Sequence, residues 1–131
     1  MRRVLILAGP LLVAALLPGR MALAGAQAQS SARATLRELE AAVERDPGNP
    51  SLQVALGVAY LERNETAQAL LVLRKAVLVG PRSAEAHNWL GVALAAKSDL
   101  PGAIAAFRKA IALDPQHGRA YSNLGSALAK S

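Results

Sequence analysis

The chain has no cysteine, and its 131 residues include one Trp, one Phe, two Tyr and two His. Without cysteine, a disulfide framework, a thiolate zinc site, a cysteine nucleophile and a lipid-modified N-terminal cysteine are all excluded. Scarce aromatic residues beside abundant Ala, Leu and Val suit close-packed helices better than strands. The composition therefore favours an all-α fold.

The chain also has only a small excess of basic over acidic residues. Of the formal net charge of +6, Arg2, Arg3 and Arg20 contribute three units within the first thirty residues, which leaves +3 for the rest. Such a small basic excess does not indicate nucleic-acid binding. We expect no nucleic-acid partner.

Residues 1–28 have the three-part layout of a secretory signal peptide. A positive start, Met1-Arg2-Arg3, precedes an apolar run from Val4 to Leu17, which Pro18-Gly19 ends. Small residues then follow at signal-peptidase spacing, and Ala24 and Ala28 are the favoured cleavage points. The run is shorter than the roughly 20 residues of a spanning helix. We expect an exported protein, periplasmic or secreted, with no stable membrane span after cleavage. An uncleaved anchor and a wrongly assigned start site are the alternatives.

The remaining chain repeats itself every 34 residues. Leu56-Gly57, Leu90-Gly91 and Leu124-Gly125 keep this spacing. So do three prolines, three small-apolar pairs and two basic pairs: Pro47, Pro81, Pro115; Ala42-Val43, Ala76-Val77, Ala110-Ile111; Arg74-Lys75, Arg108-Lys109. A fixed period of this size is typical of stacked-repeat proteins.

Residues 84–117 resemble a tetratricopeptide repeat over their whole length, through Leu90-Gly91, Ala103, Phe107, Ala110 and Asp114-Pro115. Residues 50–83 form a looser copy, while 34–49 and 118–131 resemble half copies. The resemblance implies an α-solenoid of antiparallel helix pairs over residues 29–131, with about two full repeats flanked by single half-repeat helices. It implies little about function, because the family shares a scaffold and not a chemistry.

Helical spacing predicts six helices, near residues 31–45, 51–63, 65–79, 84–97, 100–113 and 118–130. Asn64 and Ser98 fall where hairpins must turn, Asp99 can cap the following helix, and Pro101 suits its first turn.

Three glycines, Gly57, Gly91 and Gly125, lie inside predicted helices. Glycine there costs about 1 kcal/mol relative to alanine. We therefore expect a neighbouring helix to approach closely at each of them.

Residues with catalytic or metal chemistry are scattered. His87 and His117 lie 30 positions apart, and neither has a carboxylate or second histidine at ligand spacing. His87 is expected to replace a large aromatic residue and pack within its repeat, and His117 is expected in a loop. No glycine-rich phosphate loop occurs. We expect no enzymatic activity, no metal and no cofactor.

The recurring basic pairs, Arg74-Lys75 and Arg108-Lys109, allow two interpretations. They could form a basic stripe for an acidic partner or anionic lipid, or simply belong to a solvated outer face, which is the favoured interpretation.

The resemblance also implies a partner-binding groove, because the first helix of each pair lines the concave side in this family. Carried over by register, the groove residues are Val54, Val58, Leu61, Asn88, Trp89, Val92, Arg119 and Ser122. One subclass holds a terminal carboxylate with Lys, Asn and Arg; of the matching places, only Arg119 could serve here, so that clamp is expected to be absent.

Trp89 occupies a place that the family often gives to Asn. One interpretation makes it a partner-binding anchor, since Trp is enriched among interface hot spots. The other has it packing sideways between helices, where His87 leaves space.

Two functions follow as hypotheses. The leading one is a non-catalytic scaffold or adaptor of the bacterial cell envelope that binds a protein or peptide segment in its groove. The alternative is a self-association module, a homo-oligomer that stacks through its incomplete C-terminal repeat. An accessory domain of an enzyme is a third.

Overall fold

Short turns join all the helices of residues 35–131, the part of the chain that the computed structural model describes, and this part contains no strand. The helices are residues 35–45, α2 (Pro50–Glu62), α3 (Thr66–Val79), α4 (Ala84–Ala96), α5 (Leu100–Leu113) and α6 (Gly118–Lys130). The sequence predicted both ends of α2 to α6 within one residue. The predicted start of the first helix, near residue 31, and the signal peptide lie outside the described residues.

The turns form as their residue types predict. Asn64 and Ser98 have positive φ values of 61° and 65°, and they are the only such non-glycine residues described. Asp99 accepts a hydrogen bond from the N–H of Gly102 and so caps α5, with proline in the first turn. Each cap satisfies a backbone donor that the helix leaves without a partner.

Two local contacts recur with the 34-residue period. The caps of α2, α4 and α6 are Asn49, Ser83 and His117, and each accepts a hydrogen bond from a backbone N–H of the first turn. His117 lies in the loop between α5 and α6, as the sequence predicts, and it is also the N-terminal cap of α6. The side chains of Gln53, His87 and Tyr121 each reach the carbonyl oxygen of a proline six residues earlier, at 3.0 Å in all three cases.

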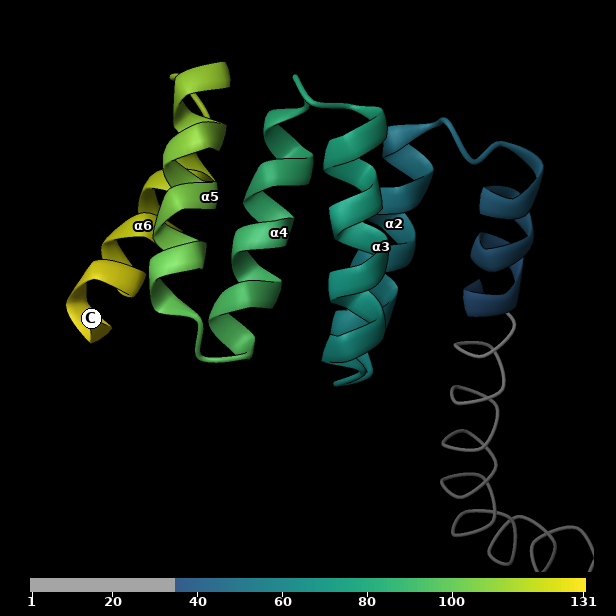
Figure 1. Ribbon diagram of the computed structural model, residues 1–131, viewed down its shortest axis with the longest axis horizontal. Coiled ribbons are helices and arrows are strands. Elements are labelled where there is room, and N and C mark those ends of the chain that lie inside the picture. The colour runs from purple at the N-terminus through teal and green to yellow at the C-terminus, as the bar shows by residue number, and fades with distance from the viewer. Residues whose placement is uncertain (1–34) are drawn as a thin grey trace, which may run out of the picture. The chain divides into compact units, whose positions relative to one another are not determined.

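The helices form two rows, because α2, α4 and α6 contact one another in sequence while α3 and α5 do not touch. Each outer helix instead packs between two inner ones: α3 contacts α2 and α4, and α5 contacts α4 and α6. Figure 1 shows α2 and α6 standing behind α3 and α5. Since the inner helices lie closer together than the outer ones, α2, α4 and α6 line the concave side.

The core consists mainly of alanines with a few large residues. Ala69, Leu73 and Ala76 are fully buried in one cluster, and Ala103 and Phe107 are buried in a second. Two glycines make this packing possible. A Cβ on Gly57 would lie 2.5 Å from Leu73, and one on Gly91 would lie 2.5 Å from Phe107. The expectation of close approach is confirmed at both positions.

Gly125 differs. A Cβ there would meet nothing within 4 Å, so the expected close approach is absent at this glycine. The helix that would cover it, in the position that α3 takes on α2 and α5 takes on α4, is not among the described residues.

A hydrogen bond between side chains joins helix 35–45 to α2. The phenol of Tyr60 donates a hydrogen bond to Oε1 of Glu40 at 2.6 Å. This hydrogen bond, with burial and the negative charges of Glu40 and Glu65, raises the pKa of Tyr60 to about 12.

Candidate functional site

The concave face is hollowed between α4 and α6. The lining residues are Asn88, Trp89, Val92, Gly118, Arg119, Ser122 and Asn123, and the open volume is about 780 Å³. We call this hollow the α4–α6 groove. It contains five of the eight predicted groove residues: Asn88, Trp89, Val92, Arg119 and Ser122. A hollow of this size could receive several side chains of a partner.

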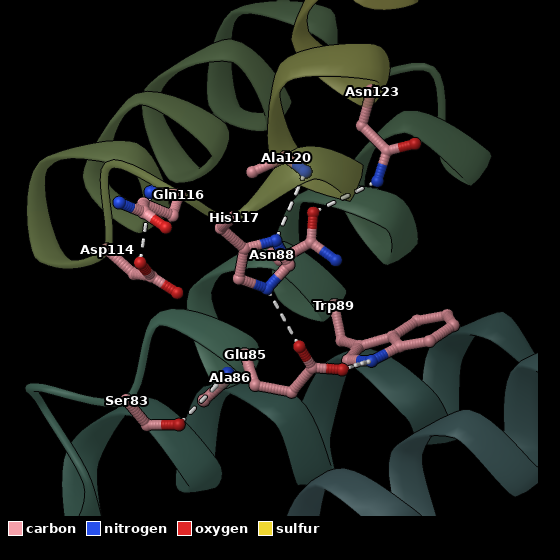
Figure 2. A network of polar contacts seen from close by, with 10 residues as sticks. All are labelled: Ser83, Glu85, Ala86, Asn88, Trp89, Asp114, Gln116, His117, Ala120 and Asn123. Atoms are coloured by element: carbon pink, nitrogen blue, oxygen red, sulfur yellow. Dashed lines mark hydrogen bonds and ion pairs between the residues drawn. The ribbon is translucent and has the colours of Figure 1, made fainter.

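Trp89 is held by a chain of polar contacts that crosses from α4 to α6 (Figure 2). Its indole N–H donates to Oε1 of Glu85 at 2.6 Å, one helical turn earlier. The other carboxylate oxygen of Glu85 lies 2.8 Å from Nε2 of His117. Nδ1 of His117 in turn accepts the capping hydrogen bond from Ala120. Because Nδ1 must be unprotonated to accept, Nε2 carries the proton and donates to Glu85.

This network fixes the edge of the groove. The side chain of His117 is only 11% exposed, and that of Glu85 is 48% exposed. A buried imidazole with both nitrogens bonded has one orientation, so Glu85 and Trp89 are held in place as well. With its only polar atom already bonded, the indole of Trp89 offers a partner apolar area alone.

Asn88 lies beneath the groove rather than at its surface. It is 1% exposed, and its Oδ1 accepts a hydrogen bond from Nδ2 of Asn123 at 3.0 Å. Asn88 therefore joins α4 to α6 through its side-chain amide, and a direct contact of Asn88 with a partner stays a prediction. Among the described residues, no buried side-chain nitrogen or oxygen lacks a hydrogen-bond partner.

The apolar residues predicted on α2 do not reach the groove. Val54 is 8% exposed and belongs to the core cluster with Ala69 and Leu73. Val58 and Leu61 are partly buried and pack against the same cluster. The prediction that Val54 faces an open concave surface is therefore wrong, because Val54 lies in a core cluster with residues of α3 and α4.

Trp89 has features of both predicted roles, packing between helices and facing a partner. It is partly buried and packs against the core cluster that contains Val54, and it also lines the groove. One side of the ring therefore stabilises the fold while another remains open to a partner.

Arg119 supplies the charge of the groove. It is exposed and has no hydrogen-bond or ion-pair partner within residues 35–131. The carboxylate of Glu85 is bound on both oxygens, by Trp89 and His117, and makes no ion pair with Arg119. The guanidinium of Arg119 is thus left available for an acidic group, which it can bind through two parallel hydrogen bonds.

The outer face carries the recurring basic pairs. Arg74, Lys75, Arg108 and Lys109 are all exposed, as expected of a solvated face. Beside the first pair, Leu71 is 70% exposed and Leu78 is 78% exposed, and both line a shallow hollow with Val43.

Residues 35–131 contain no group of three or more His, Asp or Glu that could hold a metal ion. Within the same residues, no helix combines the length and the apolarity that a membrane crossing requires.

Comparison with known proteins identifies the fold. The family model described as tetratricopeptide repeat matches residues 25–78, 54–118 and 101–131. The chain belongs to the tetratricopeptide repeat family. Proteins of this family generally mediate protein–protein interactions. No curated protein matches the chain.

Solved structures share this architecture. The chain is similar to the first tetratricopeptide domain of Spaghetti (RPAP3) bound to the HSP90 peptide SRMEEVD, with a TM-score of 0.73, 22% identity, and coverage of 78% of this chain and 81% of that one. It is similar to MamA, with a TM-score of 0.71, 28% identity, and coverage of 79% and 61%. It is also similar to a mutant O-GlcNAc transferase of Thermobaculum terrenum, with a TM-score of 0.72, 30% identity, and coverage of 76% and 19%. The chain thus matches less than two thirds of MamA and less than a fifth of the transferase.

Sequence reasoning missed the contact between Glu85 and His117. A signal was available, because His117 stands one period after Ser83 and two after Asn49, at a capping position. That register could have placed His117 at the start of α6. It could not have shown that Glu85, 32 positions away, lies against the ring.

Proposed function

We propose that this protein is a non-catalytic binding module that holds a segment of a partner protein in the α4–α6 groove. The observation that carries the proposal is the pairing of a partly buried, oriented Trp89 with an unpartnered Arg119 at one hollow. Trp and Arg are the residue types most enriched among interface hot spots.

The chemistry of the groove selects the segment. Trp89 and Val92 offer apolar area, and Arg119 offers positive charge. A segment with a large apolar side chain followed by an acidic residue would match both. Burying the apolar side chain would contribute about 1.5–3 kcal/mol, and ordering the segment offsets part of this. We expect affinities on the order of micromolar.

Trp89 provides the measurement, since it is the only Trp of the chain. Three peptide sets are titrated while Trp89 fluorescence is followed: apolar with an acidic residue, apolar with its neutral amide, and apolar with a basic residue. We expect the first set to bind most tightly and the third not to bind. Added salt should reduce the difference between the first two.

Two variants test the assignment of the charge. Arg119→Ala should remove the preference for the acidic peptide, whereas Arg108→Ala, which changes an exposed arginine on α5, should leave it unchanged. Equal binding of all three peptide sets, or equal effects of the two variants, would contradict the proposal.

We also propose that the protein is exported and acts in the bacterial cell envelope, outside the cytoplasm. The support is the three-part layout of residues 1–28. There the protein would act as an adaptor or scaffold that holds a partner segment in the α4–α6 groove.

A further inference from the structure

A second hollow lies beside the α4–α6 groove. Ala95 of α4, Phe107 of α5 and Asn123 of α6 line it, and its open volume is about 180 Å³. Val92 and Asn123 line both hollows, so the two are neighbours along the same pair of helices. The wall between them is fixed, because Nδ2 of Asn123 donates a hydrogen bond to Asn88 (Figure 2). We call the second hollow the Ala95 pocket.

The repeat explains why the Ala95 pocket is open. Leu61 stands one period before Ala95, and Trp89 stands one period before Asn123. Both of these large side chains pack against the core cluster that contains Leu73. An alanine and an asparagine at the later positions are too small to fill the same space. The difference in side-chain size on described helices therefore accounts for the opening.

The Ala95 pocket is apolar at its floor and basic at its mouth. Phe107 is 2% exposed and Ala127 is 3% exposed, so these two side chains form the floor. Lys130 also lines the pocket; it is exposed and has no ion-pair partner within residues 35–131. A cavity of about 150 Å³ is enough to hold a benzene ring. The pocket therefore has room for one aromatic or branched side chain, with an acidic group at its mouth.

We propose that the partner segment held in the α4–α6 groove places a second apolar side chain in the Ala95 pocket, beside an acidic residue that pairs with Lys130. This inference rests on the proposed function, since it assigns a second contact to the same segment. Charge complementarity supports it, because α6 contributes Arg119 to one hollow and Lys130 to the other and carries no acidic residue.

The distance between the two hollows sets the spacing of the two apolar side chains. Trp89 and Ala95 stand six positions apart on α4, which is about 9 Å along the helix axis. On an extended segment, side chains on the same side are about 6.6 Å apart at positions i and i+2 and about 13 Å apart at i and i+4. The first spacing is the closer match. The segment therefore carries apolar side chains at i and i+2, with an acidic residue at either end.

Three peptides of equal length test the Ala95 pocket on the protein recovered from cells that express the full chain. The two-anchor peptide has Leu at i and Phe at i+2 between two Asp residues. The one-anchor peptide has Ser in place of the Phe. In the third peptide, of the same composition as the first, the Leu and the Phe are adjacent. Trp89 fluorescence follows the binding of all three.

The two-anchor peptide should bind at least about tenfold more tightly than the one-anchor peptide, because the Phe side chain is removed from water. The peptide with adjacent anchors should bind no more tightly than the one-anchor peptide, since neighbouring side chains of an extended segment point to opposite sides.

Ala95→Leu gives the pocket the residue of the earlier repeat and so fills it. This variant should bind the two-anchor and one-anchor peptides equally, with the affinity that the wild type has for the one-anchor peptide. Its melting temperature should not fall, because Leu61 already occupies the equivalent position. The matched control is Ala105→Leu, which copies Leu71 of the earlier repeat on the outer helix α5. The control should keep the tenfold difference between the peptides.

Lys130→Gln tests the acidic residue beside the pocket. Replacing the Asp next to the Phe with Asn should weaken binding of the two-anchor peptide to the wild type by up to about fivefold. The same replacement should have no effect on binding to Lys130→Gln. An equal effect on both proteins would contradict the pairing with Lys130.

Equal affinities of the two-anchor and one-anchor peptides for the wild type would overturn the assignment of the Ala95 pocket and leave the proposed function intact. A tenfold difference that survives Ala95→Leu would overturn it as well, because the second side chain would then bind elsewhere. One-anchor binding that Arg119→Ala does not change would contradict the proposed function, while the effect of Ala95→Leu would still report on the pocket. Absence of binding by every peptide would overturn both proposals.

Discussion

Gly91 of α4 lies directly beneath the ring of Phe107 of α5, so closely that a Cβ on Gly91 would be 2.5 Å from Cε1 of the ring. The same relationship joins Gly57 to Leu73 one repeat earlier. Glycine is needed at both positions because the side chain of the facing helix fills the space that a Cβ would occupy.

Gly91→Ala should therefore destabilise the protein, while Gly125→Ala should not. Both substitutions gain the same helix propensity, about 1 kcal/mol, so the difference between them isolates the packing cost. Overpacking costs about 1–3 kcal/mol, and each 1 kcal/mol shifts the melting temperature by roughly 4–8 °C in a domain of this size. Thermal melts of the two variants at the same protein concentration provide the comparison. Equal melting temperatures would show that Phe107 moves aside without cost.

His117 should contribute to stability as a cap of α6. His117→Ala removes the acceptor for the N–H of Ala120 and should cost about 1 kcal/mol, whereas His117→Asn keeps a capping side chain and should cost less. Both variants lose the imidazole contact with Glu85. Chemical denaturation measures the two free energies of unfolding. If the two variants lose the same stability, the Glu85 contact dominates over the cap.

Ionisation of Tyr60 should lower the stability of the folded chain at high pH. Its pKa rises from 10.0 to about 12 in the folded chain, chiefly through the hydrogen bond to Glu40. The folded state thus holds the phenolic proton more tightly than the unfolded state. The resulting stabilisation is fully present below pH 10 and should be lost as the pH rises from 10 to about 12.

An ultraviolet titration of the phenol tests this assignment. Glu40→Gln removes the carboxylate charge and should move the ionisation of Tyr60 to lower pH, while Glu38→Gln, on an exposed position of the same helix, should not. Identical titrations for the two variants would mean that Glu40 is not the cause.

Cleavage of the export signal is the fourth prediction. Signal-peptidase spacing predicts a mature N-terminus at Gly25, Gln27 or Gln29. N-terminal sequencing of periplasmic or secreted material checks it. Ala24→Leu together with Ala28→Leu should block processing, because the enzyme reads small residues at these places. An intact Met1 in a cytoplasmic fraction would contradict export.

The 34-residue period, together with the resemblance to tetratricopeptide repeats that it led to, predicted the fold and most of the local structure. The 34-residue spacing, the turn residues Asn64 and Ser98 and the cap Asp99 predicted α2 to α6 nearly to the residue. These features could be predicted because each depends on nearby residues. A helix start and a turn depend on neighbours in the chain, and a glycine contact depends on the next helix. In a stacked repeat these neighbourhoods recur, so one copy is informative about the next.

Tertiary structure decided which of those surfaces are open. Val58 and Val92 stand one period apart and are both partly buried, yet only Val92 lines the groove. The groove edge depends on Glu85 meeting His117 across 32 positions. Such a contact does not repeat, because it arises from two particular side chains brought together by the stacking of α4 and α6. Sequence periodicity therefore determined the scaffold, and non-repeating contacts between neighbouring repeats determined the site.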